Sequence, residues 1–256
     1  MKIAVLIKQV PGSESSLTIN NAQNWVDESS VTFVMNPPDN FALEEALLIK
    51  ESRGEGEVVV ISMGPSRVTK VIREGLAKGA DRGLHLEEDD SIEVDPLTIA
   101  RRFTAVLKEE NFDLILTGLQ SDDTGMGQTG VLIGEMLGIP TATLAIETDV
   151  MDGQIKVKRE LESGWFQWVQ LPLPASISIQ SGLNTPRYPS LKGIMGAKKK
   201  EIKTFHASEL YNGTKSQSMN SIFLPTTSKK TEVIEGEVDQ VVEQIVEILR
   251  SEIKVI

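Results

Sequence analysis

The chain has 256 residues, 40% of them hydrophobic, which is enough to bury a full core as one large domain or as one domain with an appendage. Its 26 basic and 37 acidic residues give a net charge of -11, which argues against a nucleic-acid or anionic-membrane partner. The sequence has no cysteine and only two histidines, so disulfides and a cysteine nucleophile are excluded and no metal site is expected. No apolar run is long enough to span a bilayer, so the expected location is the cytoplasm or the mitochondrial matrix.

Apolar runs and helical patterns alternate through the first 150 residues. The N-terminal run MKIAVLIKQV lacks a cleavage site and indicates a first buried strand. The predicted strands are Ile3 to Ile7, Val58 to Ser62, Leu84 to Leu86 and Leu114 to Leu116, and the predicted helices are Phe41 to Glu51, Val68 to Lys78, Leu97 to Glu109 and Gly130 to Leu137. This alternation predicts a Rossmann-like three-layer α/β fold with a mostly parallel sheet.

The pattern changes from Thr141 onward, where short strands follow one another without helices. The predicted strands are Ala142 to Ile146, Ile155 to Val157, Phe166 to Leu171 and Ser176 to Ile179, with turns at Asp152-Gly153 and Ser163-Gly164. We therefore expect the sheet to end in antiparallel strands.

After Pro186 the periodicity disappears, which is unusual inside a compact domain. The expected organisation is an α/β domain over residues 1–185 and an extended C-terminal arm over residues 186–256. The arm ends in an amphipathic helix whose apolar residues recur at spacings of three and four: Val238, Val241, Val242, Ile245, Ile248 and Leu249. Such a helix needs an apolar partner surface.

A glycine-rich stretch, GLQSDDTGMGQTG, separates the strand that ends at Leu116 from the next helix. Glycine lets backbone N–H groups approach a phosphate, and the start of the following helix adds further N–H donors. The hydroxyl groups of Ser121, Thr124 and Thr129 can also donate, whereas Asp122 and Asp123 would repel phosphate and are expected to face water or a ribose hydroxyl.

The stretch matches neither G-x-x-x-x-G-K-[ST] nor G-x-G-x-x-G, so nucleotide hydrolysis and nicotinamide binding both lose support. Its spacing alone fits a surface loop without a ligand equally well.

Three other stretches are expected at the same edge of the sheet, because the carboxyl ends of parallel strands converge there. They are Ile7 to Gln9, the sequence SMGPS from Ser62, and Asn36-Pro37-Pro38 leading into a helix that Asp39 or Asn40 can cap. Each alone fits a structural role, and their convergence favours a nucleotide pocket.

Six ordered blocks of the sequence resemble the beta subunit of electron transfer flavoprotein. They are MKIAVLIKQV, MNPPDNFALEEALLIKE, MGPSRVTKVIREGLAKGADRGLHL, DLILTGLQSDDTGMGQTG, VKRELESG and LNTPRYPSLKGIMGAKKKEI. The resemblance runs from the first strand to about Ile202. It implies an adenine nucleotide alpha hydrolase-like fold and a heterodimer with an alpha subunit that carries the redox FAD.

The resemblance also implies that this chain binds a structural AMP and has no catalytic residues of its own. The implied AMP contacts are Leu6, Asn36, Pro37, Pro38, Asp39, Met63, Gly118, Leu119, Gln120, Ser121, Asp122, Asp123, Thr124, Gly125, Met126, Gly127, Gln128 and Thr129. Electrons would come from primary dehydrogenases and pass to an acceptor such as a membrane quinone oxidoreductase.

The segment LNTPRY is similar to the family's partner-recognition loop, in which an exposed Leu183 would enter a dehydrogenase pocket. The loop residues assigned to partner binding by this resemblance are Leu183, Asn184, Pro186, Arg187 and Tyr188. Glu160, in VKRELESG, matches a glutamate that pairs with an arginine of the alpha subunit. Leu183 also fits a structural role, as a residue that closes off the last strand.

Two alternatives remain open from the sequence. One is the electron-bifurcating branch of the same family, in which the beta subunit binds a second FAD in place of AMP. The other is a stand-alone nucleotide-binding stress-type protein or an ATP-using enzyme on the same fold.

Overall fold

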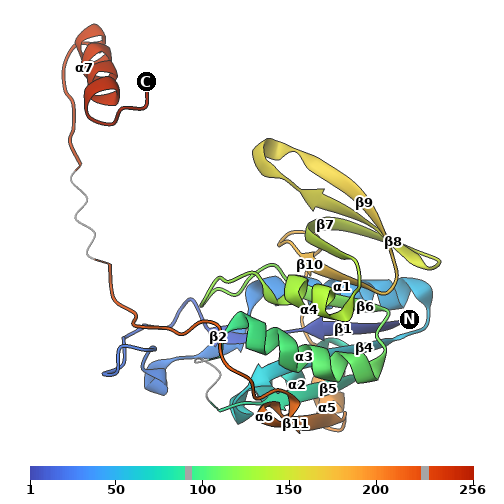
Figure 1. Ribbon diagram of the computed structural model, residues 1–256. Coiled ribbons are helices and arrows are strands. Elements are labelled where there is room, and N and C mark those ends of the chain that lie inside the picture. Colours follow the sequence, from blue (N-terminus) through green and yellow to red (C-terminus); the bar gives the residue numbers. More distant parts are fainter. Residues whose placement is uncertain (90–93, 226–230) are drawn as a thin grey trace. The chain divides into compact units, whose positions relative to one another are not determined.

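The computed structural model describes residues 1–89, 94–225 and 231–256, which divide into two units, Met1–Ile222 and Phe223–Ile256 (Figure 1). The strands are β1 (Lys2–Leu6), β2 (Gln9–Pro11), β3 (Phe33–Met35), β4 (Glu57–Gly64), β5 (Arg82–Glu87), β6 (Leu114–Gly118), β7 (Thr141–Met151), β8 (Gln154–Glu160), β9 (Phe166–Pro172), β10 (Ala175–Ile179) and β11 (Ile202–His206). The α-helices are α1 (Pro37–Arg53), α2 (Thr69–Lys78), α3 (Pro96–Glu110), α4 (Thr129–Leu137), α5 (Leu191–Ala197), α6 (Ala207–Leu210) and α7 (Val238–Ser251).

The main sheet has the strand order β11-β5-β4-β1-β6-β10-β7-β8-β9, and its strands are parallel from β11 to β7. The β7–β8 and β8–β9 pairs are antiparallel, so the predicted parallel sheet with terminal antiparallel strands is confirmed. The prediction is wrong for β10, which lies parallel between β6 and β7. All five of its residues are buried, as expected for a central strand covered on both faces.

Helices cover both faces of the sheet and make three layers (Figure 1). Ile3 and Val5 of β1 belong to the core under α1 and α2, whereas Ala4 and Leu6 belong to the core under α3 and α4. This alternation follows from the two-residue period of a strand, because both faces of the sheet are apolar.

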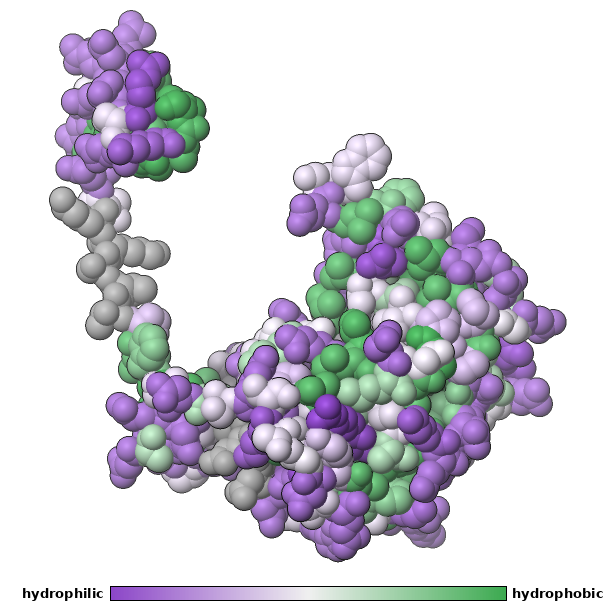
Figure 2. Space-filling model, in the orientation of Figure 1, coloured by the Kyte–Doolittle hydropathy of each residue, from purple (hydrophilic) through white to green (hydrophobic). Residues whose placement is uncertain are grey.

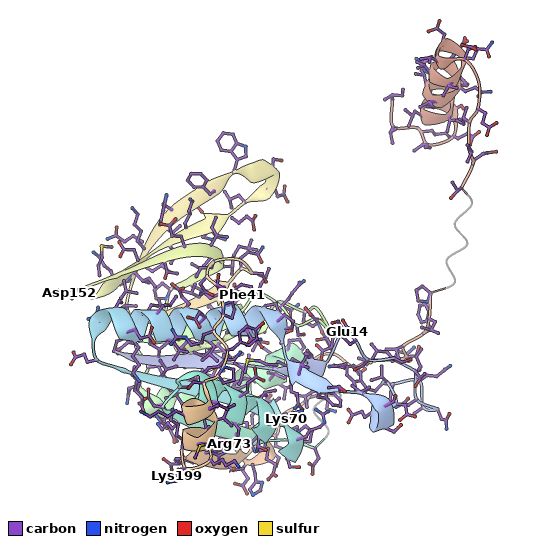
Figure 3. The ribbon with its side chains drawn as sticks, turned by 180° about the vertical axis from the view of Figure 1, so that it is seen from behind. Glu14, Phe41, Lys70, Arg73, Asp152 and Lys199 are labelled. Carbon is purple, nitrogen blue, oxygen red and sulfur yellow. The ribbon has the colours of Figure 1, made fainter. Side chains whose placement is uncertain are left out.

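Residues 186–222 belong to the first unit, so the chain does not divide at the expected boundary after residue 185. Strand β11 pairs with β5 along its whole length. Arg73 on α2 holds the chain between α5 and β11 in place, since its Nη1 donates to the carbonyl oxygens of Ala197 at 2.5 Å and Lys200 at 2.6 Å (Figure 3). Because α5 is short and β11 is an edge strand with a largely exposed face, neither produced a clear apolar period.

Arg187 attaches the chain that follows the sheet to α1. Its Nε lies 2.9 Å from Oε2 of Glu44, and its Nη1 lies 2.5 Å from Oε1 of Glu51. Hydrogen bonds to the Glu51 and Glu44 carboxylates raise the pKa of Arg187 above its usual range. The Glu44 side chain is only 6% exposed, so Arg187 is the counter-charge beside a buried carboxylate.

The second unit contains α7, so the amphipathic helix predicted at the C-terminus is confirmed. Its apolar side chains gather on one face (Figure 2). Val238, Val242, Ile245 and Val246 are exposed, and no residue of α7 is buried. None of the described residues of this unit, 223–225 and 231–256, therefore buries the apolar face. In the parts of the chain that the structure describes, no helix is long and apolar enough to cross a membrane.

Strand β9 forms the edge of the sheet, and exposed aromatic side chains lie on it and immediately before it. Trp165 and Phe166 are exposed by 74% and 53%. The Nζ atoms of Lys156 and Lys158 lie 4.5 Å and 5.7 Å from the centre of the Trp168 ring. Cation–π contacts therefore cover part of Trp168 from β8.

We expect Arg187→Met to destabilise the first unit by about 2–3 kcal/mol, because Glu44 would remain buried without a counter-charge. The matched variant Glu51→Gln removes only an exposed partner and should cost less than about 1 kcal/mol. Urea unfolding of both variants measures the difference, and equal losses would show that Glu44 does not depend on Arg187.

Candidate functional site

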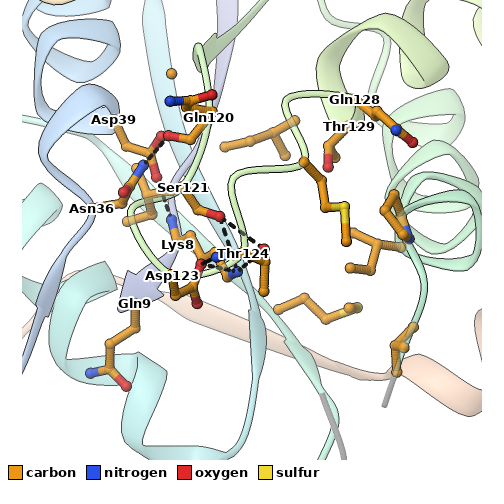
Figure 4. Close-up of a pocket in the computed structure, with 18 of the residues that line it drawn as sticks. Lys8, Gln9, Asn36, Asp39, Gln120, Ser121, Asp123, Thr124, Gln128 and Thr129 are labelled. Atoms are coloured by element: carbon orange, nitrogen blue, oxygen red, sulfur yellow. Dashed lines mark hydrogen bonds and ion pairs between the residues drawn. The ribbon is translucent and has the colours of Figure 1, made fainter. Parts of the chain in front are cut away.

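A cavity of about 320 Å³ lies at the carboxyl ends of β1, β4 and β6 (Figure 4). The predicted contacts that line it are Leu6, Asn36, Asp39, Met63, Gly118, Leu119, Gln120, Ser121, Asp123, Thr124, Met126, Gly127, Gln128 and Thr129. Pro37, Pro38, Asp122 and Gly125 do not line it. The volume lies within the range of about 300–1,000 Å³ typical of small-ligand sites.

The end of β6 and the loop that follows it require glycine at several positions, among them Gly118 and Gly127. Gly127 has φ +62°, a conformation that other residues rarely adopt. At Gly118 a Cβ atom would collide with the Asp39 side chain and with the backbone of Pro38 and Asp39. These glycines therefore let the loop and α1 lie close together beside the cavity.

Lys8 reaches the glycine-rich loop from the end of β1. Its Nζ lies 2.7 Å from Oδ1 of Asp123, 3.3 Å from Oγ of Ser121 and 3.4 Å from Oγ1 of Thr124. Burial of Asp123 opposes its ionisation, but the charge and hydrogen bond of Lys8 outweigh this and hold its pKa below the usual range. The expectation that Asp123 faces water is therefore wrong, because the carboxylate is paired inside the protein, whereas a contact with a ribose hydroxyl stays a prediction.

Asp39 lies in the first turn of α1, but it does not cap that helix as predicted. Its Oδ2 accepts the backbone N–H of Lys8 at 2.6 Å, and the α1 N-cap position is Asn36, whose side chain makes no capping bond. Burial of the carboxyl group raises the pKa of Asp39 to about 7, although the hydrogen bond from Lys8 opposes the rise. Burial therefore favours the neutral form of this carboxyl group.

Asn36 connects α1 to the glycine-rich loop. Its Nδ2 donates to the carbonyl oxygen of Gln120 at 2.9 Å, and its Oδ1 accepts the N–H of Asp122 at 3.0 Å. These two bonds hold the first half of the loop, which brings together stretches that lie 84 and 86 residues apart.

The cavity wall also offers groups that can bind a ligand. Thr117 is 6% exposed, and its Oγ1 has no hydrogen-bond partner within the described residues. The first N–H groups of α4, which begins at Thr129, lack partners within the helix. Such donors suit an anion or the hydroxyl and ring atoms of a nucleotide.

One wall of the cavity was not predicted from the sequence. Arg67 lies 3.8 Å from the centre of the Phe33 ring, and its Nη1 donates to Oε1 of Gln9 at 2.6 Å. Its Nη2 lies 2.9 Å from Oε1 of Glu28. Trp25 also lines this wall. No motif indicated these contacts, since they depend on how the β2–β3 pair folds over the end of β4.

A second unpredicted wall is formed by the segment 216–219. Asp95 caps α3 through the N–H of Thr98 at 2.9 Å, and its Oδ2 accepts the N–H groups of Ser216 at 2.6 Å and Gln217 at 3.1 Å. Gln217 and Met219 then line the cavity. This segment was expected to be part of the extended C-terminal arm, and nothing in the sequence indicated that the cap residue Asp95 would also bind it.

The residues predicted to bind partners lie outside the cavity. Leu183 is half-buried and packs against the core under α1, whereas the sequence predicted an exposed leucine. Asn184 donates to the carbonyl oxygen of Phe41 and to Oε2 of Glu45, both at 3.0 Å. Tyr188, by contrast, is 94% exposed.

Glu160 is exposed at the end of β8, where its Oε2 accepts from Nε2 of Gln180 at 2.8 Å. Pro186 is half-buried in the same segment as Asn184. The whole partner-binding assignment therefore falls on the surface of the first unit, away from the ligand-sized cavity.

Together, the sheet, its two helical layers and the cavity at the carboxyl edge define a three-layer α/β protein with a site of small-ligand size. The model of the electron transfer flavoprotein domain matches residues 23–210. The chain belongs to the electron transfer flavoprotein family, as a member of its beta-subunit group, and membership implies a role in electron transfer.

Relatives in this family align with nearly the whole chain. The electron transfer flavoprotein subunit beta of Methylophilus methylotrophus is 35% identical over 261 residues, covering 98% of each chain. That of Bacillus subtilis is 32% identical over 261 residues and covers 100% of each chain. The mitochondrial subunit of Arabidopsis thaliana is 36% identical over 247 residues, covering 96% of this chain and 97% of its own. The resemblance found in the sequence is thus confirmed.

The raised pKa of Asp39 predicts a pH-dependent stability. Between its ordinary value of 3.8 and its folded value of about 7, the folded chain keeps a proton that the unfolded chain releases. Stability is therefore lost as pH rises through this interval, and above about pH 7 the loss is complete. Asp39→Asn removes the titration, and its side-chain oxygen still accepts the Lys8 N–H. We expect the stability of this variant minus that of the wild type to increase by about 2–3 kcal/mol as pH rises from 5 to 8.

Urea unfolding of both proteins at pH 5 and pH 8 measures this increase. The pH dependence that comes from all other titrating groups is the same in both proteins and cancels in the comparison. A stability difference that stays constant with pH would contradict the assignment.

Proposed function

We propose that this chain forms a heterodimer with an electron transfer flavoprotein alpha subunit and binds AMP in the cavity as a structural ligand. The observation that carries the AMP assignment is the convergence of Lys8, the glycine-rich loop and the α4 N-terminus on one cavity. The ligand would stabilise the loop rather than react.

The donor set of the cavity fits a nucleoside monophosphate. The Lys8 ammonium and the N–H groups at the start of α4 would hold the phosphate, and the hydroxyl groups of Ser121 and Thr124 are within reach of the same region. The unpartnered hydroxyl of Thr117 would bind a polar atom of the ribose or base. The largely apolar walls formed by Leu6 and Met63 suit the adenine ring.

The working cofactor would be FAD, held mainly by the alpha subunit, and it would carry the electrons between a primary dehydrogenase and an acceptor such as a quinone oxidoreductase. This chain would supply docking surfaces and no proton transfer. The apolar face of α7 would be covered by the alpha subunit, because exposed valine and isoleucine side chains are stabilised when a partner removes them from water. Glu160 would pair with a cation of that subunit.

Two other functions would give different experimental results. An electron-bifurcating complex would contain a second FAD in place of AMP. A stand-alone nucleotide-binding protein would be stable without an alpha subunit, and the uncovered face of α7 argues against it.

Counting the nucleotides of the purified heterodimer tests the proposal. Acid denaturation should release one FAD and one AMP per heterodimer, and two FAD without AMP would establish the bifurcating alternative.

We expect Gly127→Val to reduce AMP content at least about fivefold, since valine strongly disfavours φ +62°. Gly196→Ala is the control, because a Cβ there meets nothing within 4 Å. Full AMP content in the valine variant would argue against the phosphate-loop assignment.

Leu183 is proposed as the anchor for dehydrogenases. Because interface energy concentrates in a few apolar side chains, Leu183→Ala should lower the rate constant for reduction by a dehydrogenase about tenfold or more, with flavin content unchanged. Leu191→Ala, at a site 82% exposed and outside the loop, is the control. Since Leu183 also packs against the core, thermal midpoints of both variants separate lost stability from lost docking. Unchanged kinetics with several dehydrogenases would remove the anchor role.

A further inference from the structure

The Lys8–Asp123 ion pair lies inside the cavity and joins two distant segments (Figure 4). The Asp123 side chain is 8% exposed, whereas that of Lys8 is 41% exposed. Oδ1 of Asp123 also accepts the N–H of Thr124 at 2.7 Å. The carboxylate is therefore fixed on the loop, and the ammonium group remains accessible to a ligand.

The lining of the cavity has little free positive charge to neutralise a polyphosphate. Among the described residues, the charged ones in its lining are Lys8, Arg67, Asp39, Asp95 and Asp123. Arg67 is already paired with Glu28 outside the lining. The accessible cation is thus Lys8, and Asp123 stands directly beside it.

We propose that Asp123, held in place by Lys8, is a specificity-determining residue that restricts the ligand to one phosphate group. The inference rests on the proposed nucleotide binding. A single phosphate would bind Lys8 and the hydroxyl groups of Ser121 and Thr124. A second phosphate would add negative charge next to the fixed carboxylate of Asp123. When these two charges lie within roughly 8 Å, their repulsion at an effective dielectric constant of about 20 weakens binding by at least about tenfold.

The test uses the full-length chain co-purified with its flavin-carrying partner. Equilibrium dialysis after nucleotide removal gives the dissociation constants for AMP and ADP in the wild type and in Asp123→Asn. We expect the ratio of the ADP constant to the AMP constant to fall about tenfold or more in the variant. Asp152→Asn makes the same charge change on the exposed turn between β7 and β8 and should leave the ratio within about twofold.

Two further variants keep the test decisive if Asp123→Asn does not assemble. Asp123→Glu retains the charge and should retain the wild-type ratio. Lys8→Met should weaken AMP at least about tenfold while changing adenosine binding less than about twofold, because adenosine has no phosphate.

A wild-type ratio in Asp123→Asn, or an equal loss of AMP and adenosine binding in Lys8→Met, would overturn the inference and leave AMP binding intact. A wild-type complex that binds neither AMP nor ADP would overturn the proposed function together with it.

Discussion

The buried carboxyl group of Asp39 is the contact on which the shape of the cavity depends. It accepts the backbone N–H of Lys8 at the end of β1, and it fills the space that a side chain at position 118 would need. The first turn of α1, the end of β1 and the end of β6 are therefore fixed to one another by one side chain. Removing water from this carboxyl group raises its pKa, so the junction is maintained at a cost in stability near neutral pH.

The strands around the cavity were predictable because they are buried on both faces. Continuous apolar runs in β1, β4 and β6 leave a parallel sheet as the arrangement that hides them, and parallel strands end at one edge. The location of the cavity follows from the same reasoning. Strand β11 and helix α5 were missed because they lie at the margin of the sheet, where half-exposed residues carry no clear period.

The pairings inside the cavity could not be predicted, since they join residues far apart in the sequence. Lys8 and Asp123 are separated by 115 positions, and neither motif nor spacing indicates that they meet. Asp39 illustrates a second limit. Its place in the sequence is typical of a helix cap, but burial directs the carboxyl group to Lys8 instead. The sequence predicted which segments meet at the edge of the sheet. The direction of each side chain in the folded protein decides which atoms of those segments form hydrogen bonds and ion pairs.

The first unit keeps its cavity and its exposed surface chemically separate. One wall of the cavity is fixed by polar contacts within the unit, among them the bonds from Ser216 and Gln217 to Asp95. The exposed groups lie elsewhere, at Tyr188 and along the aromatic edge of β9. A protein that both bound and consumed its nucleotide would need an exit for products and a group to activate water beside the phosphate. In the proposed site Lys8 and Asp123 are paired with each other, so neither is free to activate water.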